Sequence, residues 1–374
     1  MTAAVRYCLT ILLLAAALIA CDTTPAAVDQ RATTAPLASS APRQWDRSEE
    51  VSTHGLGEAW LSDYGFFTGP LAALQPAPGV VPYEVGAPLF SDYAGKARFV
   101  YLPEGTQATY HPTEVFDFPV GTVLIKNFYY DDHAAPVVGR RLLETRLLVR
   151  TATEWRPLSY VWDEAQTDAR FTVLGARLPV DFLDAEGTHR AFDYAVPDLN
   201  QCKNCHAWEG KTRPIGPSAR QLNTSFVYGD GETVNQLDYW TAHHLLTGTP
   251  APAARPVGLS YAAEATNTSQ AARAYLDANC GHCHRPEGSA KTSGLDLTVF
   301  NTDAYRLGIA KPPVAAGRAS GNLRHSIVPG HPEESILLYR MASAEVGVAM
   351  PELGRRLVDE RGVELVASWV RKLK

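Results

Sequence analysis

Cys202-Lys203-Asn204-Cys205-His206 has the same form as Cys280-Gly281-His282-Cys283-His284, a second pentapeptide later in the chain. Both follow the pattern C-x-x-C-H, which is the covalent attachment signature of c-type haem. Two thiols about one helical turn apart add to the porphyrin vinyl groups, and the imidazole that follows then faces the iron. The sequence therefore predicts two haem c groups, with thioether bonds from Cys202, Cys205, Cys280 and Cys283 and proximal iron ligands at His206 and His284.

Two other uses of paired cysteines fit the sequence less well. Zinc ribbons place their C-x-x-C pairs about 15–20 residues apart, whereas 74 residues separate Cys205 from Cys280. A thioredoxin-like redox pair does not require a histidine directly after the second cysteine, and here one follows each pair. We therefore favour two covalent haems over a zinc site or a thiol redox site.

The remaining cysteines belong to a predicted export signal. Residues 1–20 contain one basic residue, Arg6, and then an apolar run that is too short to span a bilayer comfortably. The run ends in Leu18-Ile19-Ala20-Cys21, which resembles the bacterial lipobox, so we expect Cys21 to be lipidated and Cys8 to be removed with the signal. All four remaining cysteines then lie in haem motifs, and no thiol is left for a disulfide. An ordinary cleaved signal, with Cys21 free, is the alternative.

Asp22, directly after the lipidated position, resembles the signal that retains lipoproteins in the inner membrane of Gram-negative bacteria. We therefore expect the protein at the periplasmic face of the inner membrane, where c-type haem is assembled, with the outer membrane as the alternative. Residues 21–50 are rich in Thr, Ala, Pro and Ser and lack apolar periodicity, which predicts a flexible membrane tether. A tether of this length has a root-mean-square reach of roughly 30 Å.

The charge of the chain limits which partners are expected, and its length limits the number of domains. The chain of 374 residues has a formal net charge of −6 and no basic block, so nucleic acid is not an expected partner. Its mature part is long enough for two or three domains with hydrophobic cores. We expect redox proteins as partners, and the sequence identifies no small-molecule substrate.

Residues 51–195 are predicted to form a β-rich module, either sandwich or barrel-like. β-branched and aromatic residues fill the run from Val120 to Tyr130, which Pro119 precedes. Two further runs, Leu142–Arg150 and Trp155–Trp162, flank a short connection and predict a hairpin. Recurring Pro and Gly argue against long helices in this region.

The rest of the chain is predicted to be helical around the two motifs, which gives an α+β multidomain fold. Residues 196–246 carry the first motif and a helical pattern from Gly231 to Leu246, and residues 247–268 are a linker. Residues 269–374 carry the second motif and form an all-α segment. Three helices are expected there: one capped by Ser269 that runs to Asn279, one that begins near Pro332, and one that begins near Asp359 and buries Val363, Val366, Trp369 and Val370.

The order of features in residues 269–374 resembles a class I cytochrome c domain, with a haem-bearing first helix, a methionine in a late loop and a closing helix. Met350, followed by Pro351, lies in that loop, so we expect it to be the distal ligand of the second haem. A thioether ligand raises the reduction potential, which suits an electron carrier. Met341 is the competing sulfur, but it falls within the apolar pattern that begins at Ile336 and is expected to be core.

The distal position of the first haem has no nearby methionine. None lies between Cys205 and the second motif, so the ligand is expected to be histidine or another nitrogen or oxygen donor, or the position is open. His243 and His244 follow the motif most closely, and either would give bis-histidine ligation and a lower potential. Histidines of the β-rich module are further candidates: His54, His111, His133 and His189.

Each proximal histidine is expected to donate a hydrogen bond from its other ring nitrogen to a carbonyl, which fixes its tautomer. The turn Arg213–Pro217 is a candidate source of that carbonyl for His206. His282, inside the second motif, is expected at the surface and away from the iron.

Several phrases outside the haem motifs resemble one family. They are GAPLFSDYA at 86–94, FPVGT at 118–122, ETR at 144–146, PIGP at 214–217 and QLN at 221–223. The family is that of Gram-negative dihaem c-type cytochrome lipoproteins, whose physiological role is largely unassigned, and the resemblance covers about residues 55–374. It implies haem c at both motifs and supplies neither a substrate nor a distal ligand for the first iron.

Three functions are compatible with these features. The leading one is a membrane-anchored periplasmic dihaem cytochrome that transfers electrons between redox partners. The second is a haem enzyme of the peroxidase type with catalysis at the first haem, although the sequence assigns no catalytic acid or base. The third is a β-rich module that binds a ligand or partner and uses the haems as a redox relay.

Overall fold

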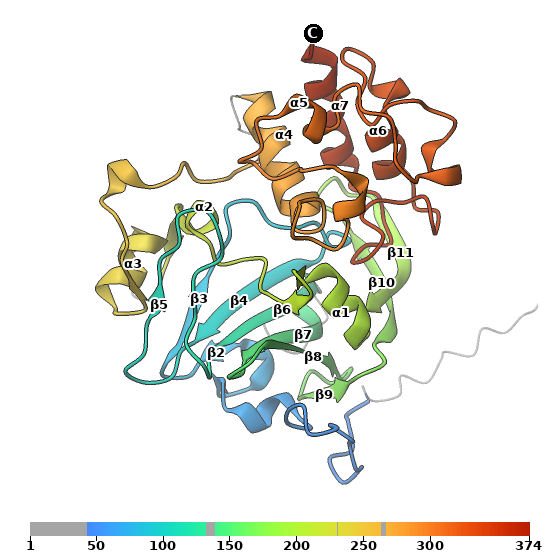
Figure 1. The fold of residues 1–374 in the computed structure, drawn as a ribbon. Coiled ribbons are helices and arrows are strands. Elements are labelled where there is room, and N and C mark those ends of the chain that lie inside the picture. Colours follow the sequence, from blue (N-terminus) through green and yellow to red (C-terminus); the bar gives the residue numbers. More distant parts are fainter. Residues whose placement is uncertain (1–42, 132–138, 230, 263–266) are drawn as a thin grey trace, which may run out of the picture. The chain divides into compact units, whose positions relative to one another are not determined.

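A six-stranded antiparallel sheet dominates the first part of the chain (Figure 1). The structure, a computed structural model, describes residues 43–131, 139–229, 231–262 and 267–374. The strands follow the order β3-β4-β6-β7-β8-β9, and the sheet is open because β3 and β9 are its edges. Their bounds are Val80–Tyr83 for β3, Gly95–Tyr101 for β4, Val123–Asp131 for β6, Arg140–Arg150 for β7, Trp155–Trp162 for β8 and Ala169–Thr172 for β9.

One face of this sheet is apolar. Side chains alternate between the two faces along a strand, and Phe99, Ile125 and Leu147 share a face because they are register partners on β4, β6 and β7. Leu61 and Phe66, from the segment before the sheet, belong to the same buried cluster. Removing each such side chain from water stabilises the fold by about 1.5–3 kcal/mol.

The opposite face is apolar at both ends and charged in the middle. At one end Leu124 joins a buried cluster with Trp240, and at the other Phe128 joins a cluster with Tyr194. Between these clusters runs a row of register partners on β4, β6, β7 and β8, namely Arg98, Lys126, Arg146 and Ser159. Cations on an interior face cost free energy unless something there compensates their charge.

Short strand pairs surround the sheet. The longest pair is the hairpin of β10 (Ala176–Leu183) and β11 (His189–Val196). The others are β1 (Phe67–Thr68) with β2 (Gln75–Pro76), β12 (Ala207–Trp208) with β13 (Lys211–Thr212), β14 (Ser225–Val227) with β15 (Thr233–Asn235), and β5 (Ala108–Thr109) with β16 (Leu246–Thr247).

Helices follow the sheet along the chain, and the last ones gather around the second motif (Figure 1). In this part α4 packs against α7, and Trp369 and Val370 are buried against Leu276. The helices are α1 (Leu199–Cys205), α2 (Ala219–Leu222), α3 (Gln236–Ala242), α4 (Thr268–Leu276), α5 (Ala304–Leu307), α6 (Ile336–Met341) and α7 (Glu360–Lys372).

The fold class is confirmed as a β-rich part followed by a more helical part. Strand β6 matches the run that begins at Val120, and β7 and β8 form the predicted hairpin, with Thr151 N donating to Glu154 O at 2.8 Å. The closing helix starts at its predicted cap, because Asp359 Oδ1 accepts from Gly362 N.

Three helices differ from the prediction. The helix expected to begin near Pro332 is α6, which begins at Ile336 after a separate 3-10 turn at Pro332–Glu334. Asn267 caps α4 in place of Ser269, since its side chain accepts from Ser269 N and Gln270 N. The helical pattern from Gly231 to Leu246 yields the shorter α3, because Thr233–Asn235 pairs as β15.

Residues Pro42–Lys374 form one compact unit. The predicted segments therefore contact one another: Phe90 N, for example, donates to Asn279 Oδ1 at 2.7 Å. The predicted signal at 1–20, Cys21, His133 and most of the tether lie outside the described residues. Within the part of the chain that the structure describes, no helix has both the length and the apolarity needed to cross a membrane.

Candidate cofactor site

The first motif begins inside α1. Asp198 caps this helix reciprocally, since its carboxylate accepts from Gln201 N at 2.8 Å and Gln201 Oε1 accepts from Asp198 N at 3.1 Å. The helix lies against β8, where Cys202 Sγ is 4.0 Å from Ser159 Oγ. The capping box thus fixes where α1 starts and brings Cys202 to one end of the polar row on the sheet.

His206 is oriented by the loop that follows α1. Its Nδ1 lies 2.8 Å from Arg213 O, which confirms the predicted turn as the source of the carbonyl. Because a carbonyl oxygen only accepts, Nδ1 carries the hydrogen and Nε2 keeps a lone pair. Burial lowers the pKa of His206 to about 4, so the ring is neutral near pH 7 and Nε2 is able to bind a metal.

The second motif follows α4 on a π-helical turn, Asp277–Gly281. Burial also lowers the pKa of His284 to about 4. Its Nδ1 lies 3.0 Å from Ser293 Oγ, and that hydroxyl donates its own proton to Ala290 O at 2.8 Å. Ser293 therefore accepts from His284, so a hydroxyl takes the place of the expected carbonyl at this motif.

The two motifs, far apart in sequence, meet in the folded chain. The thiols of Cys205 and Cys283 lie near enough to interact, and this interaction raises the pKa of Cys205 and lowers the pKa of Cys283. The loops that follow the motifs are also joined, by Glu209 N donating to Glu287 O at 3.0 Å. Groups attached at the two motifs are therefore neighbours.

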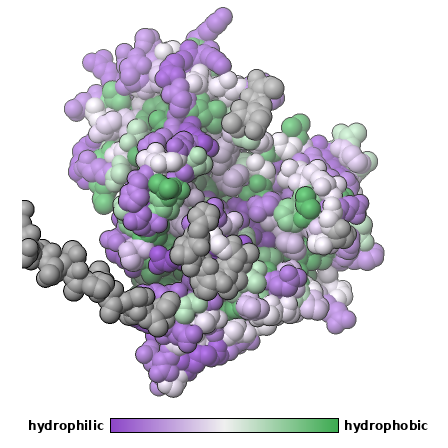
Figure 2. Space-filling view, turned by 180° about the vertical axis from the view of Figure 1, so that it is seen from behind, coloured by the Kyte–Doolittle hydropathy of each residue, from purple (hydrophilic) through white to green (hydrophobic). Residues whose placement is uncertain are grey.

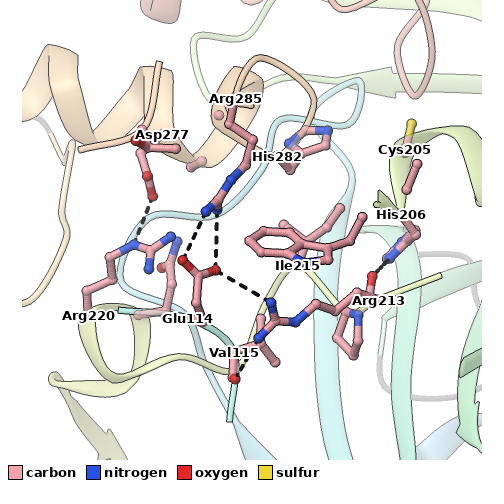
Figure 3. Close-up of a pocket in the computed structure, with 17 residues that line it drawn as sticks. Glu114, Val115, Cys205, His206, Arg213, Ile215, Arg220, Asp277, His282 and Arg285 are labelled. Atoms are coloured by element: carbon pink, nitrogen blue, oxygen red, sulfur yellow. Dashed lines mark hydrogen bonds and ion pairs between the residues drawn. The ribbon is translucent and has the colours of Figure 1, made fainter. Parts of the chain in front are cut away.

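A bridging cluster of Glu114, Trp208, Arg213 and Arg285 lines a small cavity beside the first motif, and Figure 3 shows Glu114 between Arg213 and Arg285. Glu114 Oε1 is 2.9 Å from Arg285 Nη2, and its Oε2 is 3.8 Å from Arg213 Nη1. Both guanidinium groups lie over the ring of Trp208, at 4.1 and 4.4 Å from its centroid. Since Arg213 supplies the carbonyl for His206 and Arg285 follows His284, the cluster ties the surroundings of one proximal histidine to those of the other.

His282 is half-buried rather than at the surface, so the expectation of a surface position is wrong. It lines the small cavity of Figure 3 together with Cys205 and His206. Its Nδ1 is buried and has no hydrogen-bond partner among the described residues. The physical reason is the contact between the motifs, since the first motif covers this side of the second.

A larger cavity of about 470 Å³, hereafter the central cavity, borders the first motif. Cys202, Cys205 and His206 line it, together with the charged middle of the sheet. Its volume is within the range of about 300–1,000 Å³ that is typical of ligand sites. Apolar side chains make up much of its wall: Val85, Leu89, Leu124, Leu148, Leu158, Pro197 and Ile215.

Cationic side chains supply most of the charge of the central cavity. Two of them have acidic partners: Arg98 Nη1 is 2.7 Å from Glu84 Oε2, and Arg146 pairs with the fully buried Glu144. The complete set is Arg98, Lys126, Arg146, Arg177, Arg355 and Arg356. Positive charge in an apolar cavity suits an anionic group.

These residues fit haem c at the first motif. The thiols of Cys202 and Cys205 stand at the edge of the cavity, His206 offers a neutral ring with Nε2 available, and the cations match two propionate carboxylates. At the second motif Cys280 packs at the margin of the apolar cluster between α4 and α7. There His284 has the same neutral state and a partner at Nδ1.

The two methionines occupy different environments. Met341 is buried in the cluster between α6 and α7, as predicted for a core residue. Met350 is half-buried in its loop, where its N donates to Arg340 O at 3.0 Å and Arg355 Nη2 donates to its carbonyl at 2.8 Å. The following residues Glu352–Arg356 line the central cavity. Ligation of the second iron by Met350 stays a prediction.

The structure does not bring the predicted distal histidines to His206. His243 and His244 are exposed at the end of α3, where His243 Nδ1 is 2.9 Å from Tyr239 O. Neither lines the central cavity or the cavity of Figure 3. Their helix, α3, packs against α2, β15 and β16. The short distance in sequence between these histidines and the first motif does not predict this packing.

The described histidines of the β-rich part do not line these cavities either. His54 and His189 are exposed, and His111 Nδ1 accepts from Glu114 N at 2.9 Å. The cysteines of the described residues belong to no group of three metal-type ligand atoms within 4.8 Å of one another. One such group occurs there, and it consists of the exposed His331, Glu333 and Glu334.

The charged row and the bridging cluster are parts of the site that the sequence alone did not reveal. Period-two spacing does place Lys126 on the face of Leu124 and Phe128. Alignment of Lys126 with Arg98 and Arg146 depends on the register of three strands, which this pattern leaves open.

Comparison of the chain with protein-family models, with curated proteins and with solved structures finds no match.

Proposed function

We propose that this chain is a dihaem c-type cytochrome that transfers electrons between redox partners. Cys202, Cys205 and His206 hold one haem c, and Cys280, Cys283 and His284 hold the other. The observation that carries the proposal is the meeting of the two C-x-x-C-H motifs, with both imidazoles neutral and hydrogen-bonded at Nδ1. Haem bound at these positions supplies a one-electron ferric/ferrous couple.

The contact between the motifs supports transfer within the chain. Cys205 and Cys283 interact, and Glu114 with its two arginines connects the loops around them. Electrons that enter at one motif then have a neighbouring site to move to. The β-rich part serves this arrangement by forming a wall of the central cavity beside His206.

The finer organisation belongs to the same proposal. Residues 269–374 form a class I cytochrome c domain with Met350 as the distal ligand of its iron. Lipid on Cys21 anchors the protein at the periplasmic face of the inner membrane, and redox proteins are its partners. The domain assignment is supported by the sequence pattern and by the helical character of the last part, and the anchor is supported by the sequence pattern alone.

Covalent attachment is the first test. The full chain is produced together with a haem c assembly apparatus, denatured and stained for haem on a gel. We expect stain to fall by about half in Cys205→Ala and in Cys283→Ala and to vanish in the double variant, since each motif needs its second thiol. Cys21→Ala, which lies outside both motifs, is the matched control and keeps full stain. Undiminished stain in the double variant refutes the proposal.

One observation favours a rival function, a haem enzyme of the peroxidase type. The central cavity carries cations beside His206, and such groups stabilise developing negative charge. Catalysis of this type requires an open position on the first iron. Turnover of peroxide together with a CO adduct at one haem supports the enzyme, whereas two low-spin irons without a CO adduct contradict it.

A further inference from the structure

Lys126 differs from its neighbours on the sheet. It stands between Arg98 and Arg146 in the cross-strand row, and both arginines have acidic partners, Glu84 and Glu144. Lys126 itself makes no hydrogen bond or ion pair with the described residues, and its Nζ lies over the ring of Phe128 at 4.7 Å. Lys126 is half-buried, and an amine that faces a cavity without a protein partner is available to a group bound there.

The position of Lys126 suits a group attached through Cys202. Ser159, at the end of the row, lies against the Cys202 sulfur at 4.0 Å. Lys126 is two strands further on, so its backbone is about 10 Å from that of Ser159 at the usual strand spacing. Both Lys126 and His206 line the central cavity. A planar group that is joined to Cys202 and fills this cavity therefore extends over the row.

We propose that Lys126 is the distal ligand of the first haem iron, with its Nζ bound opposite His206. This inference rests on the proposed function, since it requires haem c at Cys202 and Cys205. The bond uses the lone pair of the neutral amine, and a proton carried by the ammonium form is released to water. The first iron thus has two nitrogen ligands and no open position.

Other ligand-type side chains of the central cavity are already engaged. Asp92 accepts from Arg356 N at 2.6 Å and from Leu357 N at 2.7 Å. Glu352 has a largely exposed side chain 3.6 Å from Arg340, and Tyr83 packs edge-on against Trp240 in an apolar cluster. Neither a methionine nor a second histidine lines this cavity among the described residues.

The charge state of Lys126 agrees with this role. Burial lowers its pKa well below the ordinary value, and Arg98, Arg146 and Lys96 lower the pKa further by repulsion. A lysine ammonium has three donors and no lone pair, so only the neutral amine binds a metal. Attraction by Glu144 acts in the opposite direction and is the smallest of these influences.

A competing role for Lys126 is to pair with a haem propionate through its charge alone. Two substitutions separate the roles, because Lys126→Arg keeps the charge and lacks a ligating amine, whereas Lys126→Leu lacks both and brings no donor atom. Lys96→Leu is the matched control. Lys96 lies on β4, on the same face of the sheet as Lys126, and its register partner is Phe128. It does not line the central cavity.

The experiment uses the full chain with haem attached, and it records EPR, near-infrared magnetic circular dichroism and CO binding. We expect two low-spin irons and no CO adduct in the wild type and in Lys96→Leu. In Lys126→Leu and in Lys126→Arg, one of the two irons becomes high-spin, and CO binds at one haem of the two. The near-infrared charge-transfer band of the wild type, which depends on the ligand pair, reports an amine ligand even if a variant fails to fold.

Three results overturn the inference: two low-spin irons in Lys126→Leu, retention of the low-spin state by Lys126→Arg but not by Lys126→Leu, or a high-spin first iron in the wild type. Haem content separates these failures from failure of the proposed function. Two covalent haems per chain with any of the three results leave the dihaem proposal standing and remove Lys126 as ligand. A wild type without covalent haem removes both.

Discussion

At the scale of single residues, Ser293 influences how strongly the imidazole of His284 donates electron density to the iron that it would bind. The hydroxyl accepts from His284 Nδ1 at 3.0 Å because its own proton is committed to Ala290 O. A hydrogen bond at the outer nitrogen raises the basicity of the imidazole, and a more basic ligand favours ferric over ferrous iron. Ser293 therefore holds the potential of the second haem down.

Ser293→Ala is expected to raise the reduction potential of one haem, by about 59 mV for each tenfold loss in the preference for ferric iron. Redox titration followed in the visible spectrum measures both potentials. Thr292→Ala is the control, since Thr292 is exposed and is its immediate neighbour. Equal potentials in the Ser293→Ala variant and the wild type would show that this hydrogen bond has no electronic role.

At the scale of elements, the loop after the second motif folds back onto the motif itself. Ala290 N donates to Cys283 O at 3.0 Å, and Gly288 is buried against the same carbonyl. A Cβ at Gly288 would lie 2.3 Å from Cys283 O and 2.9 Å from His282 O. Because both contacts are with backbone atoms, relief requires the loop to move away from the motif.

Gly288→Ala is expected to lower the free energy of unfolding by about 1–3 kcal/mol, as overpacking of a tight site does. Haem content at the second motif should fall as well, because the loop holds the cysteine that binds it. Urea denaturation and haem stain measure the two effects. The control is Gly229→Ala, where a Cβ meets no atom within 4 Å. A Gly288→Ala variant with the stability and haem content of the wild type contradicts this account.

Helices and strands with a strong local sequence pattern could be predicted from the sequence, whereas the way in which they pack against one another could not. The run of β6, the β7–β8 hairpin and the closing helix at Asp359 carry their own periodicity or capping signals. The carbonyl of Arg213 was also predictable, because it lies close to His206 in sequence. The contact of Cys205 with Cys283 and the row through Lys126 depend on packing and register over long separations, which single-sequence patterns do not encode.

At the scale of the whole molecule, Asp92 connects the β-rich part to the loop that carries Met350. Its carboxylate accepts from Arg356 N and Leu357 N, and the neighbouring Tyr93 hydroxyl donates to Val358 O at 3.0 Å. Asp92 is 2% exposed, so loss of its oxygens leaves backbone donors buried without partners.

Asp92→Ala is expected to destabilise the protein by about 1–3 kcal/mol for each donor left unpaired. Asp92→Asn, which keeps one side-chain oxygen, should lose less stability at neutral pH. Burial raises the pKa of the Asp92 carboxyl above its ordinary value of 3.8, against the opposing effect of the two backbone hydrogen bonds. A carboxyl with a raised pKa binds its proton more tightly in the folded chain. Its contribution to stability is therefore greatest below the ordinary pKa and is lost as pH rises through the raised value.

The stability of the wild type relative to Asp92→Asn should accordingly decline from acid toward neutral pH, because the asparagine side chain does not titrate. Urea denaturation of both proteins across that pH range measures the difference directly. The comparison cancels titrations common to the two proteins, such as those of His206 and His284, so the remaining slope belongs to position 92. A difference that is flat, or that grows toward neutral pH, would mean that the hydrogen bonds from Arg356 N and Leu357 N outweigh burial. In that case the connection is held by a carboxylate whose charge the fold stabilises.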